Sequence, residues 1–242
     1  MSMRLNKFIA QSGMCSRRDA DRLIEEGLVT VNGMAAAAGD QVSPDDTVLV
    51  NGKRVTVSSP KMIVFNKPVG VVCSEKSNDR APTYAEYLKL SEHLFPVGRL
   101  DKDSEGLLLL TNMGALSEKI ARAGDLHEKE YEVTCKKPLS GMFFDRMRKG
   151  VRIRIPAEKS PGGAEEIYTT RPCRVTRTGE TGFNIILTEG KNRQIRRMCE
   201  ALGQKVVTLR RVRIMNITLG DLPVGASREV TAEELKRLEE LL

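Results

Sequence analysis

The chain has 242 residues, which is enough to bury a substantial core in one or two domains. Its 39 lysines and arginines against 32 aspartates and glutamates give a net charge of +7, which is compatible with a polyanionic partner without being diagnostic of one. No N-terminal apolar segment precedes a cleavage site and no run of about 20 apolar residues occurs, so we expect a cytoplasmic protein without membrane contacts. The five cysteines lack the spacing of zinc ligands, and we expect reduced thiols and no bound metal.

The N-terminal stretch predicts two short helices followed by a β-hairpin. Apolar residues recur at helical spacing from Leu5 to Ile9, and Gly13 ends the first helix. Ser16 and Asp19 form a capping box at the start of the second. An alternating stretch that ends in an Asn-Gly pair follows, and this pattern is typical of a tight hairpin.

Arg18 and Arg22 lie four residues apart and so share one face of the second helix, although charge alone is equally typical of an ordinary solvated surface. The segments RLNKFIAQSG, SRRDADRLIEEGLVTVNG and DTVLVNGK resemble the S4 RNA-binding domain over roughly residues 3–55. The resemblance implies an S4-type domain over residues 1–58. It also implies RNA contacts at Lys7, Arg17, Arg18 and Arg22.

The remainder of the chain predicts more strands than helices. After a short linker at 57–61, the stretch MIVFNKPVGVV predicts a buried strand, a turn and a second apolar run. Residues 156–170 are polar and rich in proline and glycine, so we expect a loop there. Further strands are predicted at 131–135, 151–155 and 183–188, and helices at 193–202 and 231–242.

Several familiar catalytic motifs are missing, and their absence narrows the chemistry. No phosphate-binding loop, no dinucleotide fingerprint, no metalloprotease motif and no serine-hydrolase elbow occurs. Only His93 and His127 are present, and neither lies near a serine or cysteine nucleophile in sequence. Carboxylate chemistry remains, and the stretch VGRLDKDSEGLLLLTN is its best location, because Arg99 and Asp101 point to the same side of an extended segment. A plain polar turn is equally compatible with this pattern.

Four blocks in the chain resemble one enzyme family. VGRLDKDSEGLLLLTN is similar to the signature of the RsuA/RluB/RluE/RluF family of pseudouridine synthases, with FNKPVGVV upstream and KEYEV and EGKNRQIRRMCEALG downstream. The segments RRMCEALG and RVRIMNITLGDLPVG look most like the RluF branch. The resemblance implies an α+β fold, with a catalytic domain over residues 59–242 that has a mixed, mainly antiparallel sheet flanked by helices.

The same resemblance implies the activity: a specific uridine of 23S ribosomal RNA is isomerised to pseudouridine by a flipped-base mechanism without a cofactor, with tRNA open as a second substrate. It assigns catalysis to Asp101, to Tyr131 and to Arg196, which would pair with the aspartate and keep it ionised in a dry pocket. We expect a monomer. RNA contacts in this domain are expected at Asn66, Lys67, Arg99, Leu100, Lys102, Asn192, Arg193, Gln194, Ile195 and Arg197.

Positive charge concentrates between residues 191 and 213, where eight lysines and arginines face only Glu200. We therefore expect the RNA backbone to dock there. Two other functions remain open. A non-catalytic RNA-binding protein built on an S4 domain would explain the basic stretches, and a glycosidase would use Asp101 and Asp103 as its carboxylate pair.

Overall fold

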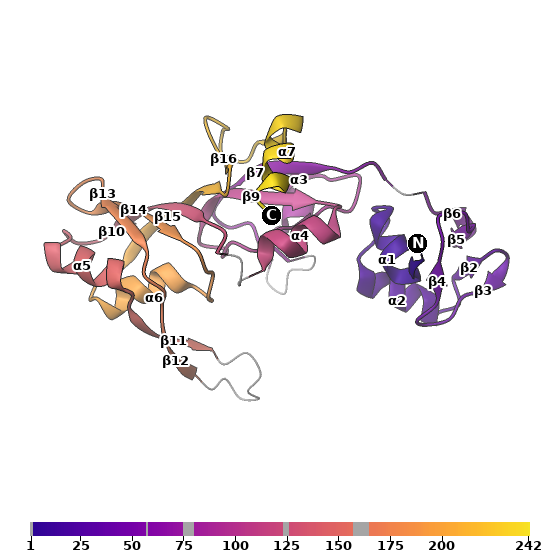
Figure 1. Ribbon diagram of the computed structural model, residues 1–242, viewed down its shortest axis with the longest axis horizontal. Coiled ribbons are helices and arrows are strands. Elements are labelled where there is room, and N and C mark those ends of the chain that lie inside the picture. The colour runs from indigo at the N-terminus through magenta and orange to yellow at the C-terminus, as the bar shows by residue number, and fades with distance from the viewer. Residues whose placement is uncertain (1, 57, 75–79, 123–125, 157–164) are drawn as a thin grey trace.

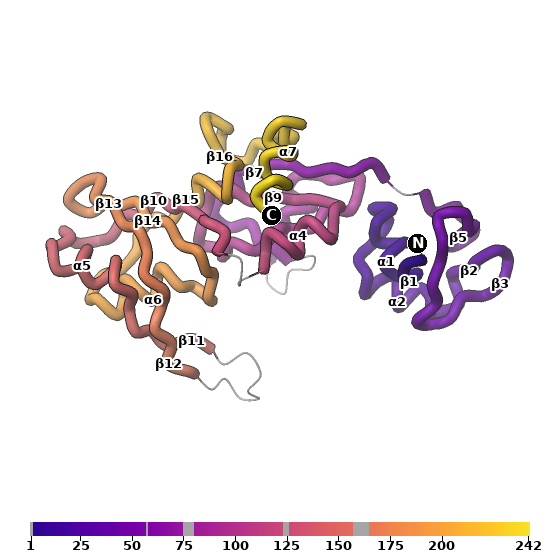
Figure 2. Tube along the Cα trace, viewed as in Figure 1, coloured from indigo at the N-terminus to yellow at the C-terminus, as the bar shows by residue number. Residues whose placement is uncertain are grey.

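The computed structural model describes residues 2–56, 58–74, 80–122, 126–156 and 165–242. Figure 1 shows a small N-terminal unit, a central body that carries the C-terminal helix, and a further lobe from which a hairpin extends. The tube in Figure 2 follows the chain from the N-terminal unit into the central body through the segment around residue 60. None of the helices in the described part of the chain is long and apolar enough to cross a membrane.

The N-terminal unit packs two helices against short strands, as the sequence predicts. Ser16 accepts a hydrogen bond from the Asp19 amide at the start of the second helix. Asn32 and Gly33 both have positive φ, at 51° and 83°, which suits a tight two-residue hairpin turn. Ile9, with none of its surface exposed, lies in the apolar cluster between helices and strands. The elements are β1 (Met3–Arg4), α1 (Leu5–Gln11), α2 (Arg17–Glu25), β2 (Val29–Val31), β3 (Met34–Ala35), β4 (Gln41–Val42), β5 (Val48–Val50) and β6 (Lys53–Arg54).

The second region is built on one mixed sheet, with strand order β13-β14-β10-β15-β9-β7-β17 and with β16 and β8 paired to β15 and β9. All of these pairings are antiparallel except that of β9 with β15, so the expected mainly antiparallel α+β fold is confirmed. Its strands are β7 (Met62–Lys67), β8 (Phe95–Pro96), β9 (Glu105–Thr111), β10 (Lys129–Cys135), β13 (Arg174–Arg177), β14 (Gly182–Leu187), β15 (Val206–Ile214), β16 (Ile217–Thr218) and β17 (Ser227–Glu229). Its helices are α3 (Tyr84–Leu88), α4 (Gly114–Ala121), α5 (Gly141–Lys149), α6 (Gln194–Ala201) and α7 (Ala232–Glu240).

The four leucines of β9 are wholly buried because both faces of the strand are covered. Leu108 and Leu110 belong to the larger apolar cluster, and Leu107 and Leu109 to a second one that includes Leu238 of α7. Burying each leucine stabilises the fold by about 1.5–3 kcal/mol relative to an exposed position. This strand is therefore a rigid support for the charged turn that precedes it.

The parallel contact between β9 and β15 joins the two halves of the sheet. Gly106 lies opposite Arg211, and a Cβ atom on Gly106 would overlap the Arg211 carbonyl oxygen. Only glycine permits this approach, and its φ of 101° also disfavours other residues. The Arg211 Nε atom donates to the Leu107 carbonyl at 2.7 Å and closes the contact.

The polar segment 156–170 differs in part from the loop that the sequence predicts. Residues Glu165–Thr169 form β12, which pairs antiparallel with β11 (Arg152–Pro156) as the hairpin that extends from the further lobe in Figure 1. The end of the segment, EEIYT, has three residues with high strand propensity, and the cross-strand partner supplies the hydrogen bonds. Residues 157–164 lie outside the described part of the chain.

Candidate active site

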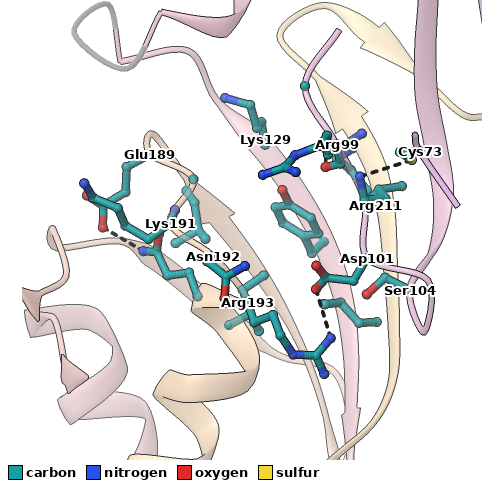
Figure 3. Close-up of a pocket in the computed structure, with 18 of the residues that line it drawn as sticks. Cys73, Arg99, Asp101, Ser104, Lys129, Glu189, Lys191, Asn192, Arg193 and Arg211 are labelled. Atoms are coloured by element: carbon teal, nitrogen blue, oxygen red, sulfur yellow. Dashed lines mark hydrogen bonds and ion pairs between the residues drawn. The ribbon is translucent and has the colours of Figure 1, made fainter. Parts of the chain in front are cut away.

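A cleft of about 720 Å³ opens beside the junction of β9 and β15. Segment 97–104 forms one wall, and segment 187–195, which leads into α6, forms another (Figure 3). Its volume is in the range of pockets that hold a small ligand or a single nucleotide. The apolar part of the lining includes Val72, Val97, Leu100, Ile120, Ile155, Leu187, Ile195, Leu209 and Ile214.

The turn that carries Asp101 is fixed by main-chain contacts on both sides. Gly98, with φ of 72°, starts the turn. The buried Leu100 donates its amide to the Cys73 sulfur at 3.5 Å, and Gly70 donates its amide to the Lys102 carbonyl at 2.8 Å. The Asp101 side chain is 32% exposed and faces the cleft. A carboxylate therefore lies at the wall of a pocket lined by both apolar and charged side chains, on a turn held by hydrogen bonds of its backbone.

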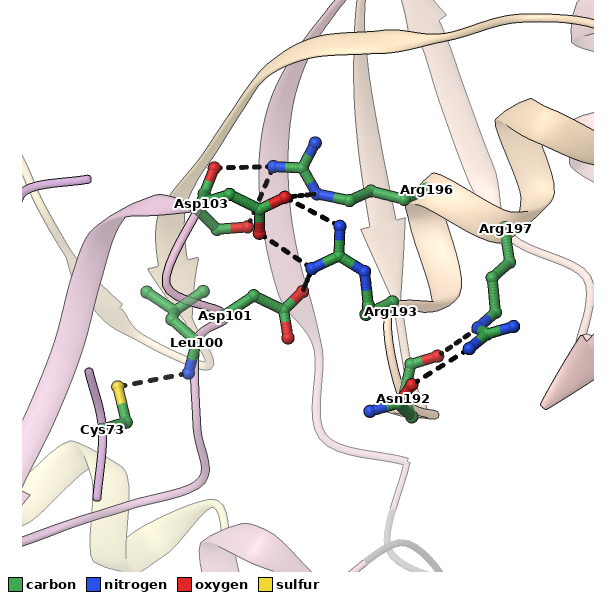
Figure 4. A network of polar contacts seen from close by, with 9 residues as sticks. Cys73, Leu100, Asp101, Asp103, Asn192, Arg193, Arg196 and Arg197 are labelled. Atoms are coloured by element: carbon green, nitrogen blue, oxygen red, sulfur yellow. Dashed lines mark hydrogen bonds and ion pairs between the residues drawn. The ribbon is translucent and has the colours of Figure 1, made fainter. Parts of the chain in front are cut away.

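The ion pair to Asp101 comes from Arg193 rather than from Arg196, so the predicted pairing is wrong. Arg193 Nη1 lies 3.5 Å from Asp101 Oδ2 (Figure 4). Arg196 Nη2 instead donates to the main-chain oxygen of Asp103 at 2.7 Å and to Ser104 Oγ at 3.3 Å. Arg193 precedes α6 and reaches the part of the turn that carries Asp101. Arg196 lies three residues further along, within α6, and reaches the part of the turn that carries Asp103 and Ser104.

Asp103 receives both guanidinium groups. Arg193 donates to its two carboxylate oxygens at 2.9 and 2.7 Å, and Arg196 Nε lies 3.4 Å from Oδ2. These hydrogen bonds hold the pKa of Asp103 below its ordinary value and raise the pKa of Arg193. Two acids of the turn and two arginines of the α6 segment thus form one network.

Tyr131 lies on β10 and lines the same cleft as Asp101. Alternation along β10 buries Tyr131, Val133 and Cys135 and exposes Glu132 and Thr134. Tyr131 is 9% exposed and pairs in register with Arg211 of β15. The tyrosine is therefore both a core residue and part of the pocket wall.

The structure contradicts two of the expected RNA contacts. Asn66 and Lys67 are 1% and 0% exposed. Asn66 Nδ2 donates to the Leu222 carbonyl at 2.7 Å, and Lys67 Nζ donates to the Pro68 and Val71 carbonyls at 2.9 and 2.8 Å. Their polar groups fix the turn after β7, so neither residue offers a surface that RNA can reach. Burial also lowers the pKa of Lys67.

Most of the other predicted residues of this domain do meet in the cleft. Arg197 lies away from it, because its guanidinium donates to the Arg154 carbonyl at 2.7 Å and packs on Asn192. The predicted residues that line the cleft are Arg99, Leu100, Asp101, Lys102, Tyr131, Asn192, Arg193, Gln194 and Ile195.

The basic residues of the N-terminal unit lie near this region but outside the cleft. Arg17, Arg18 and Arg22 are exposed on α2, and Arg22 pairs with Asp19 at 2.8 Å. Lys7 and Arg17 line a second cavity of about 370 Å³, which also touches Gly98 and α4 of the larger domain. The main cleft includes Gly98 as well, so the two hollows adjoin.

Glu189 is a buried acid of the cleft that sequence reasoning missed. It is 5% exposed and accepts hydrogen bonds from Tyr168 Oη at 2.5 Å, Arg171 N at 2.9 Å and Gln194 Nε2 at 2.7 Å. It thereby ties the β11–β12 hairpin to the first turn of α6. The sequence signal that could have identified Glu189 is its position between a predicted apolar strand and Gly190.

Two cations of the cleft, the buried Arg211 and the half-buried Lys129, were missed as well. Arg211 is 2% exposed, and its Nη1 donates to the Arg99 carbonyl at 3.4 Å. Burial, followed by the charge of Arg211, lowers the pKa of Lys129. Within the described residues, no three His, Cys, Asp or Glu side chains gather as a metal site.

Comparisons with known proteins agree with this arrangement. The family model described as RNA pseudouridylate synthase matches residues 61–201, and the S4 domain model matches residues 3–48. The chain is 45% identical over 244 residues to the dual-specificity RNA pseudouridine synthase RluF of Escherichia coli K12, covering 100% of this chain and 80% of the relative. It is 32% identical to ribosomal large subunit pseudouridine synthase B of Bacillus subtilis, over 98% of this chain and 96% of the relative. A crystal structure of a pseudouridylate synthase is similar with a TM-score of 0.66 and 30% identity, covering 99% of this chain and 100% of that one.

Proposed function

Because the chain belongs to the RNA pseudouridylate synthase family, with an S4 domain before its synthase domain, we propose that it isomerises a uridine of 23S ribosomal RNA and that Asp101 is its catalytic carboxylate. The observation that carries the proposal is the position of Asp101, in a cleft of apolar and basic side chains that it shares with Tyr131, 3.5 Å from an arginine. The division between the S4 and catalytic domains at residues 58 and 59 is part of the same proposal.

The reaction needs an ionised carboxylate and no external group donor. The bond from C1′ of the ribose to N1 of uracil breaks, the base turns, and C5 bonds to C1′; C5 loses a proton and N1 gains one. A carboxylate next to the sugar can attack C1′ or remove a sugar proton, and both routes need its negative charge. Atoms balance within the nucleotide, so the proposal includes no cofactor.

Arg193 is proposed to hold the Asp101 side chain in place of the Arg196 that the family resemblance indicated. Its Nη1 atom lies 3.5 Å from Asp101 Oδ2, so the guanidinium attracts the carboxylate and orients it in the cleft. Tyr131 is proposed to offer its ring to the flipped uracil and its hydroxyl to the proton transfer from C5. The apolar walls keep water from C1′, where hydrolysis would release free uracil.

Base flipping brings the uridine to this carboxylate at a cost of roughly a few kcal/mol. Arg99 lines the cleft two residues before Asp101, so we propose that it contacts the flipped nucleotide's phosphate or fills the vacated space. Lys102 and the residues predicted to contact RNA in and just before α6 would bind the nucleotides that flank the uridine. The exposed arginines of α2 would bind the RNA backbone further from the uridine.

The choice of 23S RNA is supported by the relatives. One similar protein is named a large-subunit synthase and another a dual-specificity enzyme, and the latter keeps tRNA as a second candidate substrate. We propose that the protein acts as a monomer in the cytoplasm, where ribosomal RNA is processed.

Mapping of pseudouridines in ribosomal RNA and tRNA tests the proposal. Cells that lack the protein should lose a pseudouridine in 23S RNA, and the wild-type gene should restore it. Asp101→Asn keeps the size of the side chain and removes its charge, so this variant should bind RNA but restore nothing. Glu105→Gln removes the same charge four residues along the chain and serves as the matched control.

The two rival functions give different results. A non-catalytic RNA-binding protein would produce no pseudouridine, with or without Asp101. A glycosidase would release free uracil from the RNA, and chromatography of the reaction mixture would detect it. Full activity of a folded Asp101→Asn protein would exclude the proposed role of the carboxylate.

A further inference from the structure

Asp103 lies two residues after Asp101, and its carboxylate faces the start of α6 (Figure 4). Arg193 donates one hydrogen bond to each carboxylate oxygen of Asp103, at 2.9 and 2.7 Å. This two-pronged geometry fixes the plane of the guanidinium as well as its distance. The Nη1 atom that donates to Asp103 is the same atom that lies 3.5 Å from Asp101. The hydrogen bonds to Asp103 thus determine how the Arg193 guanidinium approaches Asp101.

The backbone of Arg193 does not by itself determine where its side chain points. Arg193 is the N-cap of α6 in a left-handed conformation, with φ of 51°, and it makes no side-chain capping bond. A non-glycine residue in this region is strained and persists where surrounding contacts hold it. The next residue is fixed independently, because Gln194 accepts from the Lys191 amide at 2.9 Å and donates to Glu189 at 2.7 Å. Arg193 is 39% exposed, so without Asp103 its side chain would sample other rotamers in solvent.

Arg196 supports Asp103 from the other side. Its side chain is 13% exposed, and Nη2 holds the main-chain oxygen of Asp103 at 2.7 Å. The same atom lies 3.3 Å from Ser104 Oγ. The order of contacts is therefore from Arg196 to the Asp103 backbone, from the Asp103 carboxylate to Arg193, and from Arg193 to Asp101.

We propose that Asp103 is a positioning residue that holds the Arg193 guanidinium beside Asp101 before RNA binds. Asp103 touches neither the uracil nor the sugar in this proposal, and it acts only through Arg193. The inference rests on the proposed role of Asp101 as the catalytic carboxylate. It explains why Asp103, which takes no part in breaking or forming the glycosidic bond, contacts both Arg193 and Arg196.

Single-turnover kinetics with saturating RNA test the proposal in the full-length protein. Asp103→Asn removes the charge and one acceptor oxygen, so the rate of pseudouridine formation should fall by roughly 100-fold, the usual effect of a small misplacement of a reacting group. The Kd for RNA should change by less than about threefold, since the phosphate contacts remain. Asp103→Glu, which keeps a carboxylate, should recover part of the rate. Glu105→Gln should behave as wild type.

A double-mutant cycle separates positioning from a general structural role. If Asp103 acts through Arg193, then Asp103→Asn causes no further loss in an Arg193→Ala background. Losses that multiply would overturn the proposal, because they would show that Asp103 contributes independently. A faster Asp103→Asn enzyme would also overturn it, since Asp103 would then draw Arg193 away from Asp101.

Arg193→Lys provides a second test if the Asp103 variants do not fold. Lysine keeps the charge but cannot make the two-pronged contact, so it should reproduce most of the rate loss, whereas a wild-type rate would contradict the proposal. The outcomes also separate this inference from the proposed function. An inactive wild-type protein or an active Asp101→Asn variant refutes the function. An active wild type, an inactive Asp101→Asn and an unaffected Asp103→Asn refute the inference alone.

Discussion

The S4 domain and the catalytic cleft use arginine in opposite ways. Arg17 and Arg18 are exposed on α2, and within the described residues no acid lies within ion-pair distance of either. In the cleft, Arg193 is held by carboxylates and Arg211 is 2% exposed with hydrogen bonds to two carbonyls. Exposed side chains attract any polyanion at long range, and fixed ones create a defined field at one carboxylate. Under the proposed function, arginines would therefore serve affinity in one region and chemistry in the other.

The largest effect should come from breaking the junction that fixes Arg211. Gly106→Ala places a methyl group against the Arg211 carbonyl oxygen, so the free energy of unfolding should fall by about 3 kcal/mol. Thermal unfolding should show a melting temperature lower by roughly 10 °C, and activity should be lost before RNA binding by the S4 domain. Gly141→Ala is the control and should be nearly neutral, because an added Cβ atom would meet nothing within 4 Å beyond its chain neighbours and its own helix backbone. Equal stability of the two variants would contradict the close approach.

Removing the exposed arginines of α2 should have the next largest effect and should act on affinity alone. Arg17→Ala with Arg18→Ala should weaken RNA binding about tenfold, and the slope of log affinity against log salt should shrink by about 0.7 for each phosphate that the protein no longer neutralises. Turnover with saturating RNA should stay at the wild-type value. Lys53→Ala with Arg54→Ala removes the same charge from β6 and should change the slope less. An unchanged slope for the α2 pair would show that this surface does not meet RNA.

A smaller loss of stability and rate is expected from removing the Tyr168 hydroxyl, a neutral hydrogen-bond donor to Glu189 in the cleft. Tyr168→Phe leaves Glu189 buried with one donor fewer, so the protein should lose about 1 kcal/mol of stability in denaturant unfolding. The rate should drop severalfold because Glu189 fixes the first turn of α6 through Gln194. Ile167→Ala, at an exposed neighbour on β12, is the control. A stability equal to wild type would show that the hydroxyl adds nothing.

The smallest effect concerns an ion pair outside both regions, between Arg228 and Glu234, which measures what a partly exposed arginine contributes to stability. The Arg228 guanidinium lowers the pKa of Glu234 below its ordinary value of 4.5. Glu234 therefore contributes stability above pH 4.5, and this contribution is lost as the pH falls through the lower pKa of the folded state. Glu234→Gln should cost at most about 1 kcal/mol at pH 7 and nothing at about pH 2. Glu233→Gln, in the same helical turn, is the control in urea titrations at both pH values.

Local patterns predicted much of the fold. The Ser16 cap and the Asn32-Gly33 turn depend on neighbours within a few residues, and both were expected from the sequence. Strand β12 was missed because its stability comes from pairing with β11 across a long connection. The local composition of that segment pointed to a loop instead.

The site was predicted less completely. The sequence singled out Asp101 and Tyr131, which do share the cleft. It predicted that Arg196 pairs with Asp101 and that Asn66 and Lys67 contact RNA. Both predictions were wrong. In each case the error concerned the partner of a polar side chain, and no short-range rule determines that partner.

The sequence by itself determined the family, the two-domain order and the turn that carries the carboxylate, because motifs and periodicity are local records of chemistry and packing. Tertiary structure alone decided which guanidinium reaches Asp101 and which cations are buried. Those outcomes depend on where α6 and β15 come to lie against β9, and a displacement of one helical position moves an arginine by several ångströms. Close-range electrostatics changes greatly over such a distance, so it is set only when the chain has folded.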